Sequence, residues 1–95
     1  MTLHIITRSD SQSQSVYHCL SFIGKKDTLL FIEDGTYCIL NNHLCDTLQS
    51  KNIQCYYLQA DLAARGLSAN DNVLIVDYNG FVTLTENHYP SQTWG

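Results

Sequence analysis

The chain has 95 residues, of which 44% are hydrophobic and 15% are charged. A chain of this length forms one domain, residues 1–95, and buries roughly 60 to 68% of the surface of its unfolded state, enough for one hydrophobic core. Nine Asp and Glu against five Lys and Arg give a formal net charge of −4. The chain therefore lacks the basic surface that holds a phosphate backbone, and we expect no direct nucleic-acid binding.

The N-terminal residues and the apolar segments are not typical of an exported or membrane protein. Residues 1–8 contain no basic stretch followed by an apolar stretch, and no apolar run approaches membrane-spanning length. We therefore expect a soluble cytoplasmic protein without membrane contact. In that compartment the four cysteines are expected to be reduced thiols rather than a disulfide framework.

The chain begins with a strand pattern and then a helix pattern. Residues 3–7 are rich in β-branched side chains and predict a strand. Ser9-Asp10-Ser11 offers several helix caps. Apolar residues then fall at i, i+3, i+4 and i+7 over residues 16–23, which predicts an amphipathic helix that ends at Gly24.

The middle of the chain repeats this alternation. Residues 28–32 predict a buried strand, and Glu33-Asp34-Gly35 after it predicts a turn. Residues 42–50 predict a second helix, and residues 53–57 predict a third strand.

The last third contains two further helix patterns and one strand pattern. Asp61 is a helix cap or first-turn acid, and Arg65-Gly66 is a helix stop signal. Residues 73–76 are all apolar, and this lack of alternation predicts a strand covered on both faces. Residues 78–87 predict a last helix, and Pro90 marks the start of a tail.

Strands that alternate with helices imply right-handed crossovers and parallel strand pairing. The predicted fold class is therefore α/β. We expect a small flavodoxin-like or Rossmann-like domain with a mainly parallel sheet of four or five strands and helices on both faces.

Several short segments together resemble the DsrH/TusB family of sulfur-relay subunits. They occur in the family's order across nearly the whole chain: Glu33-Asp34-Gly35, residues 61–67 (Asp-Leu-Ala-Ala-Arg-Gly-Leu), Asp77-Tyr78, Phe81-Val82, Leu84-Thr85, and Ser91-Gln92 shortly before Trp94. The resemblance implies the family's α/β fold. It also implies a B-type subunit of a heterohexamer with TusC/DsrF-like and TusD/DsrE-like homologous subunits.

Within the family, this complex passes persulfide sulfur toward 2-thiouridine at the tRNA wobble position. The resemblance places the reactive thiol on the D-type partner, so this chain is expected to be a non-catalytic interaction subunit and not itself an enzyme. Two alternatives stay open. The chain could be a sulfur carrier with a persulfide on Cys19, or a DsrH-like subunit in dissimilatory sulfur oxidation.

Cys19 is the thiol with the strongest claim to a role, because it occupies the first-helix position where DsrH-type members carry a cysteine. The local pattern favours burial, since Cys19 lies on the apolar stripe about two turns beyond the expected cap. His18 points about 100° away around the helix and is a poor activator of the thiol.

The remaining candidate groups favour structural roles. Cys38, Cys45 and Cys55 alternate with apolar residues and are expected to fill the core. Cys38, His43 and Cys45 could bind a metal, but no fourth ligand is evident for a closed zinc site, so we predict no metal. No Gly-rich phosphate motif is present, and we expect no cofactor.

The strand ends and the chain ends complete the set of candidates. Glu33-Asp34 and Asp77-Tyr78 follow strands, where a carboxylate could act as a base, but capping and turn formation are favoured. His4 and His88 receive no role. The aromatic residues of the tail, Tyr89 and Trp94, are candidate interface anchors, with Trp94 docked either on its own core or on a neighbour.

Overall fold

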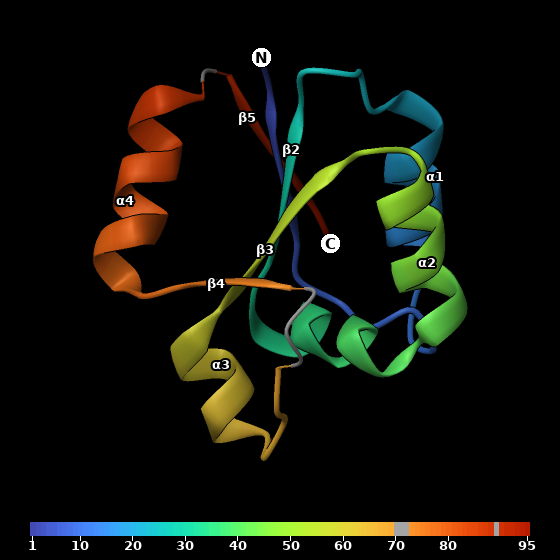
Figure 1. The fold of residues 1–95 in the computed structure, drawn as a ribbon, viewed down its shortest axis with the longest axis vertical. Coiled ribbons are helices and arrows are strands. Elements are labelled where there is room, and N and C mark those ends of the chain that lie inside the picture. Colours follow the sequence, from blue (N-terminus) through green and yellow to red (C-terminus); the bar gives the residue numbers. More distant parts are fainter. Residues whose placement is uncertain (70–72, 89) are drawn as a thin grey trace.

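The computed structural model describes residues 1–69, 73–88 and 90–95, and these form a five-stranded parallel sheet with helices on both faces (Figure 1). The strand order is β4-β3-β2-β1-β5, and every neighbouring pair is parallel. This confirms the predicted α/β class. In chain order the elements are β1 (Leu3–Ile6), α1 (Ser15–Phe22), β2 (Thr28–Phe31), the 3₁₀ helix η1 (Glu33–Leu40), α2 (Asn42–Ser50), β3 (Gln54–Leu58), α3 (Gln59–Ala64), β4 (Leu74–Val76), α4 (Tyr78–Asn87) and β5 (Ser91–Trp94).

The strand order explains which helix covers which face. From β1 to β4 each strand is added on the same side of the previous one, and right-handed crossovers then place the connecting helices on a single face. From β4 the chain returns across the sheet to the other side of β1, where it forms β5. This last connection runs in the opposite direction across the sheet, so a right-handed crossover places its helix on the other face. Figure 1 accordingly shows α1 and α2 on one side of the sheet and α4 alone on the other.

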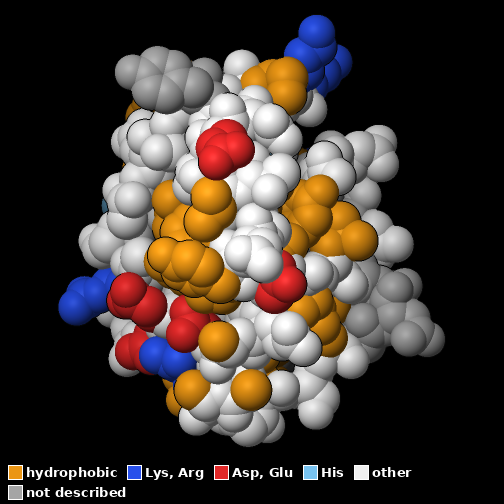
Figure 2. All heavy atoms as spheres, turned by 90° about the vertical axis from the view of Figure 1, so that its left-hand side faces the viewer, with side chains coloured by type: hydrophobic (Ala, Val, Ile, Leu, Met, Phe, Trp, Pro, Cys, Tyr) orange, Lys and Arg blue, Asp and Glu red, His pale blue; other side chains and the backbone are white. Residues whose placement is uncertain are grey.

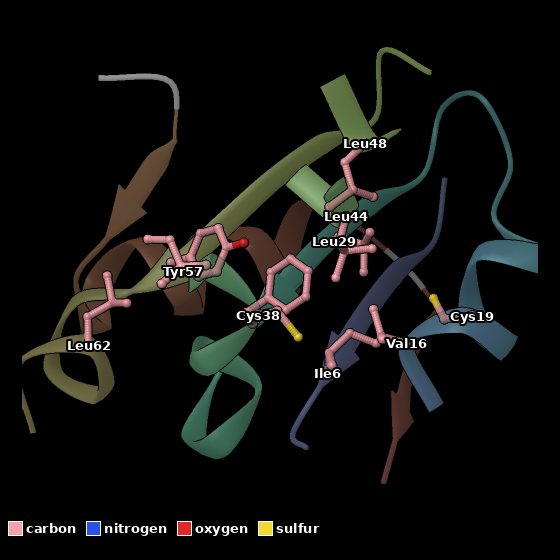
Figure 3. Packing of buried hydrophobic residues seen from close by; sticks show 11 residues of the cluster. Ile6, Val16, Cys19, Leu29, Cys38, Leu44, Leu48, Tyr57 and Leu62 are labelled. Carbon is pink, nitrogen blue, oxygen red and sulfur yellow. The ribbon is translucent and has the colours of Figure 1, made fainter. Parts of the chain in front are cut away.

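The sheet separates two hydrophobic clusters. The larger cluster lies under α1 and α2 (Figure 3), and its central aromatic pair, Phe31 and Tyr57, stacks with ring centroids 4.6 Å apart. The smaller cluster lies under α4 and contains Leu3, Leu30 and Leu84. β1 and β2 supply both clusters, which is why all four residues of each strand are buried.

Most predicted helices are confirmed, with one correction at a helix start. α2 has the predicted bounds, and α3 ends before Gly66, whose φ of 66° suits a residue without a Cβ. The prediction that Ser9-Asp10-Ser11 caps the first helix is wrong. Gln14 occupies that N-cap and makes no side-chain cap bond, whereas Ser9 Oγ accepts from the Gln12 amide in a preceding turn.

Three further differences concern the last strands and the segment after β2. Glu33-Asp34-Gly35 begins a 3₁₀ helix of eight residues rather than a simple turn. The tail after Pro90 forms β5, which pairs with β1 from Leu3↔Ser91 to Ile6↔Trp94. The prediction that residues 73–76 are covered on both faces is wrong, because β4 is an edge strand and its Leu74 and Ile75 are 47% and 43% exposed.

Candidate functional site

In an open parallel sheet, ligands bind beyond the carboxyl ends of the strands, and here that edge is occupied by η1. The Ile32 amide donates to the Ile6 carbonyl (3.0 Å), which holds the start of η1 against the end of β1. Gly35 comes so close that a Cβ would lie 2.1 Å from the same carbonyl oxygen. Only glycine fits there, so η1 lies directly against the end of β1.

The carboxylates at this edge form a small ionic cluster. Arg65 donates to Asp34 through Nε (3.0 Å) and Nη2 (2.9 Å), and its Nη1 lies 3.8 Å from Asp61. Asp61 also accepts from the Glu33 amide (2.6 Å), where Glu33 adopts a positive φ of 51°. These charges join η1 to α3 and support the expected structural role.

The carboxylate beyond β4 has a capping role. Asp77 is the N-cap of α4, and its Oδ1 accepts from the Gly80 amide at 2.8 Å. This is the role that sequence reasoning favoured over that of a general base. A base needs a nucleophile within hydrogen-bond reach, and no such side chain accompanies Asp77 among its hydrogen bonds in the described part of the chain.

Cys19 lies on α1 inside the larger hydrophobic cluster and is fully buried (Figure 3). Burial, with a smaller contribution from the charge of Asp27, raises the pKa of its thiol to about 12. A thiol with that pKa is almost entirely protonated at neutral pH and is a poor nucleophile. The expected burial of Cys19 is therefore present in the isolated chain.

The other three cysteines lie on the same side of the sheet. Cys38 is fully buried, which confirms its predicted core role, whereas Cys45 and Cys55 are half-buried. Burial raises the pKa of all three thiols, to about 12 for Cys38 and Cys55. Within residues 1–69, 73–88 and 90–95, no group of three or more His, Cys, Asp or Glu side chains is placed to hold a metal ion.

Cys45 and Cys55 line a cavity of about 460 Å³ between α2, β3 and the start of β4. The Tyr57 hydroxyl lies 4.0 Å from the Cys45 Sγ. The other walls come from α2 and from Ile53, Val73 and Leu74. The sequence pattern did not indicate this cavity, because it depends on how far α2 extends over the sheet.

Sequence reasoning missed a buried polar group that involves His4. The imidazole Nε2 lies 3.0 Å from Asp27 Oδ2, and the Trp94 Nε1 donates to its Nδ1 at 3.1 Å. An indole N–H is only a donor, so Nδ1 carries no proton and Nε2 donates to Asp27. This chain of bonds connects β1 with β5 and with the residue before β2.

The tail and the second neglected histidine also have defined places. Trp94 packs on its own chain beside Phe22 (ring centroids 5.9 Å apart), so one of the two predicted docking modes is present. Tyr89, the other candidate anchor, lies outside the described residues. His88, for which the sequence indicates no site role, makes structural bonds: its Nδ1 donates to the Leu84 carbonyl and its Nε2 accepts from the Thr28 hydroxyl (both 3.1 Å).

Taken together, the described groups can stabilise a fold but supply no activated nucleophile. All four thiols have a raised pKa, and the carboxylates beyond the strand ends are engaged in caps and ion pairs. No helix in the described part of the chain is long and apolar enough to cross a membrane.

Comparisons with known proteins agree with the resemblance seen in the sequence. The family model described as "DsrH like protein" matches residues 8–91. Protein TusB of Yersinia enterocolitica is 31% identical over 90 residues, covering 86% of this chain and 95% of the relative. Protein TusB of Escherichia coli K12 is 33% identical over 78 residues, covering 79% and 82%. Protein TusB of Buchnera aphidicola is 32% identical over 95 residues, covering 97% and 99%. On this family match and these near full-length relatives, the chain belongs to the DsrH/TusB family.

Proposed function

We propose that this chain is a non-catalytic subunit of a cytoplasmic sulfur-relay complex that serves 2-thiolation of the tRNA wobble uridine. The observation that carries the non-catalytic part is the burial of the thiols: Cys19 and Cys38 are fully buried, and burial raises the pKa of all four. Membership of the DsrH/TusB family supports the sulfur-relay part. The acidic balance of the chain supports a role that does not include holding the RNA.

In this proposal the persulfide is carried by a TusD/DsrE-like subunit, and this chain contributes surface and stability to a heterohexamer that also contains a TusC/DsrF-like subunit. A chain of 95 residues has a small hydrophobic core and buries a modest fraction of its surface on folding. Contact with homologous subunits would bury more surface and so stabilise it. The protein should then co-purify with the two homologous chains in equal proportion. A chain that stays monomeric beside both partners contradicts the proposal.

The non-catalytic role is tested by sulfur transfer through the assembled complex. We expect Cys19→Ser to retain transfer from a persulfide donor and to leave the thiouridine yield unchanged. Cys45→Ser, which alters a half-buried thiol, is the matched control. Intact-mass measurement supplies the decisive readout: a persulfide on Cys19 that disappears in Cys19→Ser, together with lost transfer, would instead make this chain a sulfur carrier.

A further inference from the structure

The edge strand β4 is far less covered than its sequence predicts. Its residues Leu74, Ile75 and Val76 form an apolar run typical of a strand buried on both faces, yet Leu74 and Ile75 are 47% and 43% exposed. Successive side chains of a strand point to opposite faces of the sheet. Both faces of β4 are therefore open, and β4 pairs only with β3 in the described structure, so its outer backbone edge is also free.

The arrangement of the helices explains this exposure. Among the described residues of the connection from β3 to β4, the one helix is α3, which has six residues and follows directly on the end of β3. A cavity lies beside Val73 and Leu74, between α2, β3 and the start of β4. On the sheet face opposite α1 and α2, α4 is the one helix among the described residues, and a helix about 10 Å wide covers roughly two strands spaced about 4.8 Å apart.

The helix after β4 also carries exposed apolar side chains. On α4, which directly follows β4, the apolar side chains of Tyr78 and Val82 are also exposed (72% and 38%). Figure 2 shows this side of the molecule, with hydrophobic side chains gathered across its middle and acidic side chains between them. We call Leu74, Ile75, Tyr78 and Val82 the β4 surface.

The charged side chains of the segment from β4 to the end of the chain, Asp77 and Glu86, have one sign. Residues 66–95 contain no Lys or Arg. Asp77, between β4 and α4, and Glu86, near the end of α4, are both exposed. A partner that covers this surface must therefore combine an apolar centre with basic side chains, because charges across an interface are arranged with opposite sign.

We propose that the β4 surface is the docking site for a homologous α/β subunit, whose own apolar edge strand, flanked by Lys or Arg, lies alongside β4. This inference rests on the proposed function, which supplies homologous subunits as partners. An added strand would use the free backbone edge of β4, as in other complexes formed by strand addition. Its side chains would cover Leu74 on one face and Ile75 on the other, and its basic residues would face Asp77 and Glu86.

The test measures association of this chain with its co-purified homologous subunits by calorimetry. Tyr78→Lys combined with Val82→Lys places two cations on exposed positions of α4. This double variant should raise the dissociation constant at least tenfold. The matched control is Leu40→Lys, which changes a similarly exposed (67%) apolar residue on η1 and should stay within twofold of the unmodified chain. Circular dichroism and urea unfolding confirm that each variant is folded.

Two further measurements address the strand edge and the charges. Amide hydrogen exchange at residues 74–76 should slow in the complex, because an added strand bonds the outer edge of β4. Asp77→Asn with Glu86→Gln should slow association several-fold at low salt and reduce its salt dependence. Asn at position 77 still caps α4, so the helix start is preserved.

The possible outcomes separate this inference from the proposed function. If the unmodified chain binds neither homologous subunit, both proposals are overturned. If it binds, but the lysine variants at positions 78 and 82 bind equally well or Leu40→Lys has the larger effect, only the β4 surface is wrong. Unchanged exchange at residues 74–76 in a stable complex also overturns it.

Discussion

The carboxylate of Asp27 joins the N-terminal segment to the loop between α1 and β2, and its removal should lower the stability of the fold. Its oxygens accept from the Gly24 amide (2.9 Å), the Thr2 amide (2.9 Å) and the imidazole Nε2 of His4 (3.0 Å). Asp27→Asn keeps the shape of the side chain but replaces one acceptor by a donor that faces other donors. We expect the variant to be folded and less stable at neutral pH.

The pKa of Asp27 provides the magnitude. Burial raises this pKa, but the hydrogen bonds from His4, Gly24 and Thr2 outweigh burial and lower it from 3.8 to about 2. The unfolded chain therefore binds the Asp27 proton more tightly than the folded chain does. The contribution of Asp27 to the free energy of unfolding is fully present above about pH 4 and is lost as the pH falls through about 2. The shift corresponds to roughly 2 kcal/mol for a side chain that is 17% exposed, with about half of it lost at pH 3.

Urea unfolding at pH 7, 5 and 3 measures this contribution. We expect Asp27→Asn to lower the free energy of unfolding by about 2 kcal/mol at pH 7, equivalent to a midpoint temperature lower by roughly 8 to 16 °C. At pH 3 the difference in unfolding free energy between Asp27→Asn and the unmodified chain should be about half of its value at pH 7. Asp46→Asn, at an exposed position on α2, is the control and should have no such effect. An Asp27→Asn deficit that is the same at pH 3 as at pH 7 would refute the role assigned to the charge.

Three other substitutions or treatments test the site. Gly35→Ala should lower the free energy of unfolding by about 1 to 3 kcal/mol, since its Cβ would meet the Ile6 carbonyl; an effect below about 0.5 kcal/mol in urea would contradict the close approach. Arg65→Met should cost only about 0.5 to 1 kcal/mol, because its partner Asp34 is 43% exposed, and raising the salt concentration should shrink the difference in unfolding free energy. Cys19 in the folded chain should react with iodoacetamide at pH 7.5 roughly 100-fold more slowly than in urea, as followed by mass spectrometry; equal rates would show an accessible thiolate.

The sequence predicted the parts of the fold that depend on local pattern. The stripe from Val16 to Ile23 and the stop signal at Gly66 each act through neighbours within one or two helical turns, so both appear where they were expected. The capping role of Asp77 is likewise local, because an N-cap bonds an amide three residues away. The burial of Cys19 followed from its place on the apolar stripe.

The errors have a common physical cause. Four apolar residues in a row indicate a buried strand, but whether β4 is buried depends on the length of α3 and on the strand's place at the edge of the sheet. The segment that forms β5 is only four residues long and shows no apolar alternation, and it becomes a strand because β1 offers it a backbone edge. His4 appeared without a role because its partners, Asp27 and Trp94, are 23 and 90 residues away.

By itself the sequence determined the α/β alternation, the α-helices, the family and the net negative charge, since all of these follow from composition, period and short motifs. Only the tertiary structure decided that β4 is left open, that η1 packs against the end of β1 and that His4 joins Asp27 to Trp94. These features arise from contacts between segments far apart in the chain, and no local pattern encodes the order in which the strands pair.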